Sequence, residues 1–361
     1  IDHVNRKRVK NNKENSSCKP GTVVIDAMQV VQKMKKSDNI LTFNDLFSQF
    51  ITDIESLIAS AKYIAVAFDT YQDKSLKNAT RMYRKGKLEK VYKEYSVSDI
   101  TDIKKLTMKE ILSNERTKRN LTTYFMYKLE MYFRERRKYF VIAGNGQTIR
   151  SWHNNPSFNN HEEADTLIPY CLHEIGGNRK SALVYSNDTD VFVLLVSHAS
   201  SLDYEQLFMK WSNHDSIDIK QICEKLGETH RKALIGVHSF TGCDTVEKFS
   251  DKSKEKWINF YLNCDSDIIK SLSQMPSEIT ENVFNNIEKL VCSVYSTQEV
   301  CIDDLPSLRY KMFKKNSANN ERIPPTKGAL LQHLKRSHIQ ARIWKNALME
   351  VMDLVNPLDY G

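Results

Sequence analysis

Seven acidic residues, most of them at the ends of apolar segments, have carboxylates that could share metal ions. Mg²⁺ and Mn²⁺ prefer oxygen ligands. Two such ions about 3.5–4 Å apart can activate water and stabilise the charge that develops when a phosphodiester is hydrolysed. A single Asp after a strand is as readily a turn residue or a helix cap, but several at once favour a metal site. The seven residues are Asp26, Asp69, Glu163, Asp165, Asp188, Asp190 and Asp244.

Four short apolar runs predict the strands that would position most of these acids. Such runs, separated by helices, are typical of a parallel sheet buried on both faces, and ligands bind at the carboxyl ends of its strands. Three of the four runs are followed by an acid or an acid pair, so separate segments would bring carboxylates to one edge. The spacing of apolar residues over 42–61 predicts an amphipathic helix. The four runs are Thr22–Ile25, Tyr63–Phe68, Tyr139–Ala143 and Ser181–Tyr185.

The rest of the sequence predicts helical additions to this α/β core. Residues 70–138 form a charged, mostly helical insertion. Its Lys, Arg and Tyr residues could follow phosphates and stack on bases, or its tyrosines could pack the helices together. Residues 218–249 indicate helix, turn, helix, and a last helix is expected over 328–355. We therefore expect a flexible basic tail over 1–20, a core over 21–270 that includes the insertion and a helix-turn-helix region over 218–265, and a helical extension over 271–361.

The composition limits the kinds of partner that the protein could bind and the cellular compartment in which it is expected. The net charge of +8, from 53 Lys and Arg against 45 Asp and Glu, is a moderate excess that hints at a polyanionic partner. No stretch approaches the roughly 18–20 uncharged apolar residues of a membrane helix, so no membrane partner is expected. The 7 cysteines form no CxxC pair, which indicates a reducing compartment, nucleus or cytoplasm. Arg6, Lys7, Arg8 and Lys10 fit a nuclear-import signal, which favours the nucleus, or a solvated basic tail.

Five short motifs resemble, in order, those of the flap-endonuclease and XPG-type 5′-nucleases of the PIN-like superfamily. Each motif is weak alone, but their order and approximate spacing match over residues 21 to about 265. The segments His161–Thr166, Asp188–Val191 and Phe240–Thr245 also resemble an uncharacterised group of such proteins that is expanded in invertebrate genomes. The five motifs are Val24–Ala27, Ala67–Asp69, Glu163–Asp165, Ser186–Asp190 and Gly242–Asp244.

The resemblance implies a PIN-like fold and a nuclease that cleaves DNA or RNA with two Mg²⁺ or Mn²⁺ ions. It assigns all seven acids to the metals, directly or through water, with Asp165 in place of a Glu. Glu163 matches by alignment, although Glu162 lies three residues before Asp165 and would share a helix face with it. Lys77 and Arg84 have the family's seven-residue spacing and would contact the scissile phosphate, or would form a solvated basic face.

Two features depart from the family pattern. Gln32 stands about where the family has an aromatic residue that stacks on a substrate base, and Phe249–Ser253 replaces the Gly-x-Gly hairpin that grips duplex backbone. Metal-dependent hydrolysis at the acids stays possible, whereas the family's usual specificity for flap or duplex substrates does not follow from this sequence. The alternative function is therefore a PIN-like scaffold that binds nucleic acid without cleaving it. The intact acids argue against this alternative, because a pure binder gains nothing from negative charge that faces phosphates.

Overall fold

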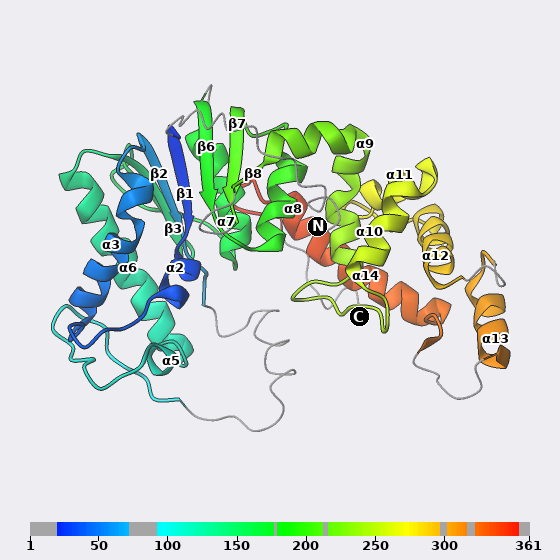
Figure 1. Ribbon diagram of the computed structural model, residues 1–361, viewed down its shortest axis with the longest axis horizontal. Helices are drawn as coiled ribbons and strands as arrows, with labels where there is room; N and C mark the ends of the chain where they lie inside the picture. The colour runs from blue at the N-terminus through cyan, green and yellow to red at the C-terminus, as the bar shows by residue number, and fades with distance from the viewer. Residues whose placement is uncertain are drawn as a thin grey trace.

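A computed structural model describes residues 20–71, 92–176, 179–211, 216–296, 302–315 and 322–353. The predictions for the tail up to residue 19, for Lys77 and for Arg84 lie outside these ranges. Eight described strands form one sheet in the order β5-β4-β3-β2-β1-β6-β7-β8 (Figure 1). The strands are β1 Thr22–Asp26, β2 Tyr63–Ala67, β3 Tyr139–Gly144, β4 Gln147–Arg150, β5 Ser157–Phe158, β6 Arg179–Tyr185, β7 Tyr204–Lys210 and β8 Ser216–Asp218.

The centre of the sheet is parallel, as the four apolar runs predicted. β1 pairs with β2 on one side and with β6 on the other, and β3 and β7 extend the parallel array outward. The edge strands β4, β5 and β8 are antiparallel and were not expected, because short polar strands such as Gln147–Arg150 contain no apolar run. The protein therefore has an α/β fold with a mainly parallel central sheet flanked by helices.

Alternate side chains of the central strands enter two separate cores. Val23 and Ile25 of β1 belong to the core formed with α2, α3 and α6, whereas Val24 belongs to a larger core formed with α7, α8 and α9. Neighbouring side chains of a strand point to opposite faces, so this fully buried strand requires helices on both sides. Figure 1 shows the two helix layers to either side of the sheet. The helices are α2 Ala27–Lys33, α3 Phe43–Ile58, α6 Glu115–Glu135, α7 Ala164–Ile175, α8 Thr189–His198 and α9 Ile219–Phe240.

The described part of the insertion is less helical than predicted. α5 (Met108–Ile111) and α6 are helices, but residues 92–107 contain none. Within this stretch, Asp99 accepts hydrogen bonds from Tyr124 and Lys128 of α6. Polar side chains that bond across a loop compete with helix formation, and here they fasten the loop onto α6. Tyr124 thus has a packing role, one of the two roles that the sequence allowed for the tyrosines.

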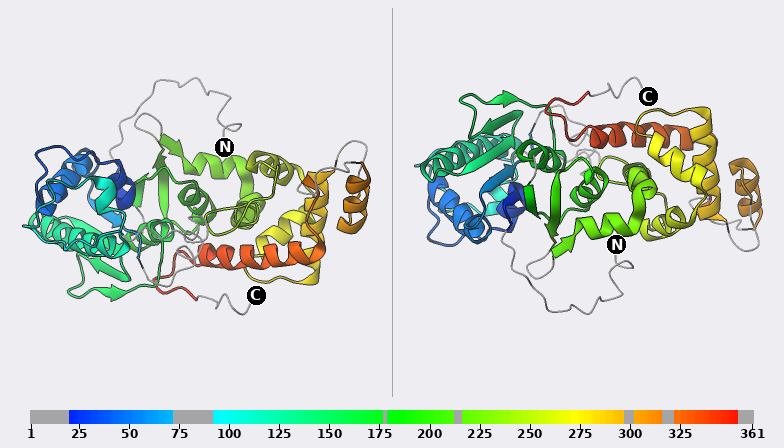
Figure 2. Two further views of the ribbon diagram at one scale, coloured as in Figure 1. Left: turned by 90° about the horizontal axis from the view of Figure 1, so that it is seen from below. Right: turned by 90° about the horizontal axis from the view of Figure 1, so that it is seen from above.

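The C-terminal helices complete the larger core. Val24 of β1 and Trp344 of α14 belong to the same hydrophobic cluster, and α14, red to orange in Figure 2, packs against α9. The division of the chain at residue 270 stays a prediction. None of the described helices is long and apolar enough to cross a membrane. The remaining helices are α10 Lys254–Asn263, α11 Ser266–Gln274, α12 Glu281–Tyr295, α13 Leu305–Lys315 and α14 Lys327–Lys345.

One detail of the helical region adds to the sequence prediction and another differs from it. Gly227, with φ of 75°, breaks α9 into two helical segments, so the turn lies inside this element. The last helix ends at Lys345 rather than at 355. Residues 346–353 instead turn back toward the sheet, where Glu350 accepts a hydrogen bond from Arg150 at 2.9 Å. This tertiary contact stabilises a path that a continued helix could not follow.

Candidate metal centre

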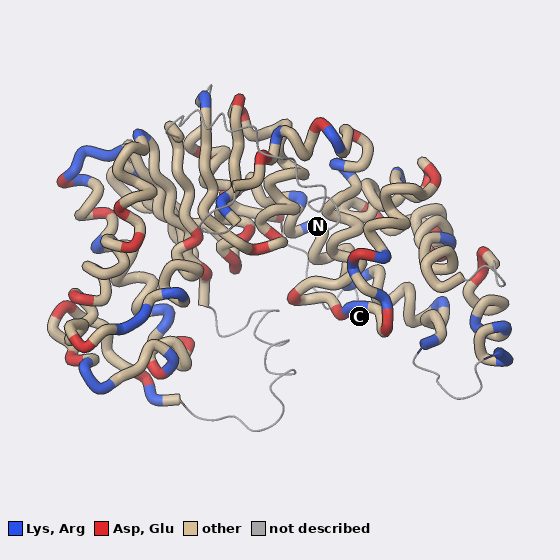
Figure 3. Tube along the Cα trace, viewed as in Figure 1, with Lys and Arg blue, Asp and Glu red and all other residues tan. Residues whose placement is uncertain are grey.

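Most of the predicted acids lie at the carboxyl ends of β2, β1 and β6. From β1 the sheet continues through β2 and β3 on one side and through β6 and β7 on the other, so the strand order reverses between β1 and β6. In open α/β sheets, ligands bind in the crevice at such a reversal. Figure 3 shows acidic positions gathered below the central strands, with Lys and Arg positions to either side.

Asp26 ends β1, and hydrogen bonds hold both of its carboxylate oxygens. Its Oδ1 accepts the backbone N–H of Gln29 at 3.0 Å, which caps α2, and its Oδ2 accepts the hydroxyl of Ser186 at 3.3 Å. The Oε1 atom of Gln29 accepts the N–H of Asn187 at 2.6 Å. Side chains therefore join the ends of β1 and β6 in addition to the backbone ladder.

The surroundings of Asp26 oppose its negative charge. The residue is only 8% exposed. Burial raises the pKa of Asp26 to about 6; the hydrogen bond from Gln29 opposes this shift, while the nearby charges of Asp69 and Asp188 add to it. A cation bound between these carboxylates would reverse the penalty, so the arrangement fits a metal site better than a purely structural role.

Asp69 fixes the start of α7 from the end of a different strand. It lies two residues beyond β2, and its Oδ1 accepts the N–H of Ala164 at 3.0 Å. Glu163 is the N-cap residue of α7, and Asp165 is buried in the first turn. Because α7 begins at Ala164, Glu162 lies before the helix. It therefore shares no helix face with Asp165, which was the argument for Glu162 as an alternative to Glu163.

The segment before α7 is anchored by the turn that follows α14. The ring of His161 is buried, with Nδ1 2.9 Å from the hydroxyl of Thr166 and Nε2 2.8 Å from the carbonyl of Met349. Burial lowers the pKa of His161 to about 4, so its neutral ring donates through Nε2 and accepts at Nδ1. Residues 346–353 therefore help to hold the start of the helix that carries Asp165.

Three acids come close enough to share one ion. Carboxylate oxygens of Asp165, Asp188 and Asp190 all lie within 4.8 Å of one another. Oxygen ligands in the octahedral shell of Mg²⁺ lie about 3–4 Å apart, so this set of donors fits a hard divalent cation. Asp188 also caps α8, because its Oδ1 accepts the N–H of Asp190 at 2.8 Å. Since the charge of Asp188 acts on Asp26 as well, one acidic cluster runs from Asp26 and Asp69 through Asp188 to Asp165 and Asp190.

Two residues beside the acidic cluster were not identified from the sequence. His238 of α9 is 3% exposed, and its Nε2 lies 2.7 Å from Oδ1 of Asp190. Burial lowers the pKa of His238, and the contact with Asp190 opposes this shift. The ammonium group of Lys254 lies 3.5 Å from the same Nε2 and donates to the carbonyl of Gly242 at 2.7 Å. The one signal in the sequence was that His238 stands just before the motif Gly242–Asp244.

Asp244 does not belong to the trio of close acids; it is exposed on the loop that joins α9 to α10. The loop nevertheless passes near the acidic cluster. Burial raises the pKa of the Cys243 thiol, and the charge of Asp190 adds to the shift. Gly242 allows the tight turn here, because its φ is 109° and a Cβ atom would lie 2.9 Å from the Cα of Lys248.

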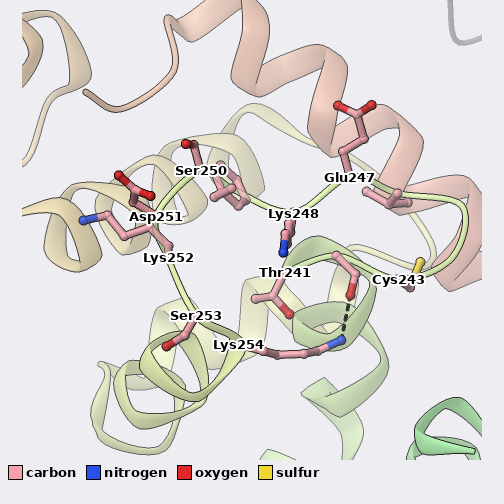
Figure 4. A pocket seen from close by; sticks show the side chains of 12 residues that line it. Thr241, Cys243, Glu247, Lys248, Ser250, Asp251, Lys252, Ser253 and Lys254 are labelled. Atoms are coloured by element: carbon pink, nitrogen blue, oxygen red, sulfur yellow. Dashed lines mark hydrogen bonds between the residues drawn. The ribbon is translucent and has the colours of Figure 1, made fainter. Parts of the chain in front are cut away.

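The same loop surrounds a polar hollow of about 1110 Å³, which is lined by residues 241–243 and 246–254. Lys248 and Lys254 point toward the interior of the loop, whereas Lys252 points outward (Figure 4). The Nζ atom of Lys252 lies 4.3 Å from the ring centre of Tyr295. We call this loop, Thr241–Lys254, the basic loop after Lys248, Lys252 and Lys254, although Asp244, Glu247 and Asp251 balance their charge. Lys248 and Lys254 offer cations to an anionic ligand beside the acidic cluster.

The structure thus brings five of the seven predicted acids into one cluster. Glu163 lies at the start of α7, next to that cluster, and Asp244 lies on the basic loop. Lys77 and Arg84 lie outside the described residues, so their proposed contact with phosphate stays a prediction. The role of every one of these residues as a metal ligand or catalytic group likewise stays a prediction.

No protein-family model and no curated protein matches the chain. Among solved structures, the chain is similar to the bacteriophage T5 D15 protein co-crystallised with metal ions, with 14% identity, coverage of 90% of each chain and a TM-score of 0.41. It is also similar to a bacteriophage T5 D15 flap endonuclease in a pseudo-enzyme–product complex with DNA and metal ions. In that pair the identity is 13%, the coverage is 89% of this chain and 98% of the other, and the TM-score is 0.38. Similarity at this level assigns neither an activity nor a site to the chain.

Proposed function

We propose that the chain is a nuclease that hydrolyses phosphodiester bonds of DNA or RNA with divalent metal ions. The observation that carries the proposal is the acidic cluster at the reversal of strand order. There Asp165, Asp188 and Asp190 place oxygens within 4.8 Å of one another, and the pKa of the neighbouring Asp26 is raised to about 6 by burial and by the charges of nearby acids. Crowded carboxylates of this kind repel one another until cations neutralise them.

The proposed ligands divide into two overlapping sets. Asp165, Asp188 and Asp190 would hold one Mg²⁺ or Mn²⁺ ion, and Asp26 and Asp69 would hold a second together with Asp188. Glu163 and Asp244 would contribute through water. When bound, two ions in such a site supply an activated water and stabilise the charge on the attacking and leaving oxygens.

Other residues of the chain would position these ligands and the substrate. Ser186 and Gln29 hold Asp26 by hydrogen bonds of 3.3 and 3.0 Å, and His238 holds one oxygen of Asp190 at 2.7 Å. The other oxygen of Asp190 is then directed away from His238. Lys248 and Lys254 of the basic loop would attract the phosphates of the strand that is cleaved. Lys77 and Arg84 are proposed to contact the scissile phosphate.

The test is a cleavage assay with Mg²⁺ or Mn²⁺ on labelled single-stranded, flap and duplex substrates, each as DNA and as RNA. Wild type is compared with Asp188→Ala, and Asp53→Ala serves as control because Asp53 is an exposed acid on α3. We expect Asp188→Ala to lose more than about 100-fold in rate, beyond the 10–100-fold typical for residues that only support a ligand. Equal cleavage by wild type and Asp188→Ala, or no cleavage of any substrate by wild type, would contradict the proposal.

The alternative is a scaffold that binds nucleic acid without cleaving it. The observation in its favour is the sequence Phe249–Ser253 in the basic loop, where the family that the sequence resembles has a glycine-containing hairpin. This alternative predicts that wild type and Asp188→Ala bind the same oligonucleotides and that neither releases product. The cleavage assay together with a binding measurement on the same substrates separates the two functions.

A further inference from the structure

A second hollow lies on the other side of Lys254, between α8, α9 and α10. Its volume is about 470 Å³, and most of its lining is apolar or aromatic, including Phe192, Trp211, Ile258 and Tyr261. The ring of Phe192 meets the ring of Trp211 edge to face, with centroids 6.4 Å apart. Both rings are half-buried. The hollow therefore offers partly exposed aromatic surface inside a concave site, which is the usual character of a ligand pocket.

This aromatic hollow lies at the same edge of the sheet as the acidic cluster. Trp211 directly follows β7, and β7 pairs in parallel with β6, whose end leads to Asp188. Strands of a sheet lie about 4.8 Å apart, so Trp211 stands at the same edge as the acids, one strand further along. Thr189, which lies between Asp188 and Asp190 in sequence, also lines the hollow, as does His238.

The aromatic hollow also borders the basic loop. Lys254 lines both the polar hollow and the aromatic one, so it lies between them. A strand that occupies both would place an anionic group near Lys254 and a flat, mostly apolar body in the aromatic hollow. A nucleotide strand has these properties, because every base has a ring face that stacks on aromatic side chains, and each base is joined to a phosphate.

We propose that the aromatic hollow binds one unpaired nucleobase, while the backbone of the same strand follows the basic loop and presents a phosphate to the acidic cluster. This inference rests on the proposed function and narrows it, because a paired base cannot enter the hollow. The substrate is then a single strand, or a duplex with an unpaired nucleotide next to the cleaved bond.

The probe is a short oligonucleotide, made as DNA and as RNA, that carries the fluorescent base 2-aminopurine at one position at a time. Binding is measured in Ca²⁺, which takes oxygen ligands like those of Mg²⁺. For wild type, we expect the fluorescence of one position to be quenched more than that of its neighbours. We expect Trp211→Ala to lose this quenching and about 10-fold in affinity, the scale of one base stacked on an aromatic ring.

Two further variants distinguish stacking from damage to the fold. Trp211→Phe keeps a ring and should retain the quenching. Trp152→Ala is the matched control, because Trp152 is an exposed tryptophan between β4 and β5 on the other side of the sheet, and it should bind as wild type does. Loss of quenching in Trp211→Phe equal to that in Trp211→Ala, or in Trp152→Ala to the same extent, would overturn the proposal.

An abasic scan separates this inference from the proposed function. Removing the base at the quenched position should weaken binding by wild type about 10-fold and binding by Trp211→Ala little. Equal effects at every position, or equal quenching in a blunt duplex, would overturn base binding. Position-specific quenching that depends on Trp211, in a protein that cleaves nothing in Mg²⁺ or Mn²⁺, would support the base site and contradict the nuclease.

Discussion

The two ends of the acidic cluster differ in how their negative charge is compensated. At one end Asp26 is 8% exposed, and burial together with the charges of Asp69 and Asp188 raises its pKa to about 6. At the other end Asp190 is half-buried and has His238 at 2.7 Å, with Lys254 just behind that ring. Both carboxylates accept hydrogen bonds, but within the described part of the chain the protein places a cation only near Asp190 and leaves the charge of Asp26 to be neutralised by something that binds.

The two ends of the site therefore differ in how far the protein itself compensates the negative charge of the carboxylate. The Asp190 end has His238 as a donor and Lys254 nearby, which together favour its negative charge without ions. The Asp26 end stores an unfavourable interaction that a cation would relieve, which is how a binding site gains affinity at the expense of stability. Changes at the two ends should therefore have different effects on metal affinity and on folding.

The largest effect is expected from Asp188, the acid that connects the two ends. Asp188→Asn keeps the shape and the capping acceptor of α8 but removes the charge that both ends share. We expect Mg²⁺ or Mn²⁺ affinity, measured by calorimetry, to fall more than about 100-fold, above the range for residues that only support a ligand. Asp53→Asn on α3 should bind the metal as wild type does. A fall of less than 10-fold would mean that the two ends do not depend on Asp188.

Asp26→Asn should have opposite effects on folding and on metal binding. A carboxyl whose folded pKa is raised stabilises the folded state when protonated, and that contribution is lost as pH rises from about 4 through 6. The shift from 3.8 to about 6 corresponds to at most about 3 kcal/mol. In EDTA at pH 7.5, Asp26→Asn should therefore be more stable than wild type by up to that amount.

The measurement is denaturant unfolding of both proteins between pH 4 and pH 8, with EDTA and with Mg²⁺. At pH 4 the two proteins should differ least, and Mg²⁺ should stabilise wild type more than the variant. A metal-free variant that is less stable than wild type at pH 7.5 would show that the charge of Asp26 is compensated within the protein.

At the other end, His238→Leu removes the donor that holds Asp190. We expect metal affinity to fall about 10- to 100-fold, the usual cost of losing a group that orients a ligand. His333→Leu is the matched control, because His333 is also buried and bonded, but to the carbonyl of Phe240. Both variants should lose stability, and only His238→Leu should lose metal affinity. Equal affinities in the two variants would contradict the positioning role.

The smallest effect is expected in the basic loop. Gly242→Ala places a Cβ atom 2.9 Å from the Cα of Lys248 at φ of 109°, whereas Gly227→Ala meets nothing within 4 Å at φ of 75°. Both variants carry the backbone strain of a positive φ, about 1–2 kcal/mol, and Gly242→Ala must also displace the loop. Oligonucleotide affinity should therefore fall several-fold in Gly242→Ala and stay unchanged in Gly227→Ala. Equal affinities would mean that the loop does not contact the strand.

Features encoded by short stretches of sequence were predictable. The four apolar runs gave the parallel centre of the sheet, because burial on both faces leaves a continuous apolar pattern. The ends of those runs also indicated where Asp26, Asp69 and Asp188 lie. Features that depend on distant partners were not predictable. The edge strands β4, β5 and β8 are polar and short, and residues 92–107 form a loop whose Asp99 bonds to α6.

The supporting groups of the site were missed for the same reason. His238 stands 48 residues after Asp190, and only the packing of α9 against α8 brings them to 2.7 Å. Trp211 follows a strand that the apolar pattern did not reveal, so its place beside the acids could not be known from sequence. Whether Glu162 shares a helix face with Asp165 depends on the first residue of α7, which the sequence alone left open.

The turn at residues 346–353 has a consequence for the order in which the protein matures during synthesis. His161 lies just before α7 and Arg150 bonds to Tyr170 and Glu174 within it, and their partners Met349 and Glu350 are translated about two hundred residues later. While the ribosome is still adding those residues, α7 lacks two of the contacts that support it. The acidic cluster would then reach its final geometry only after residues 346–353 have emerged, and a chain terminated before them would carry the acids without their full support.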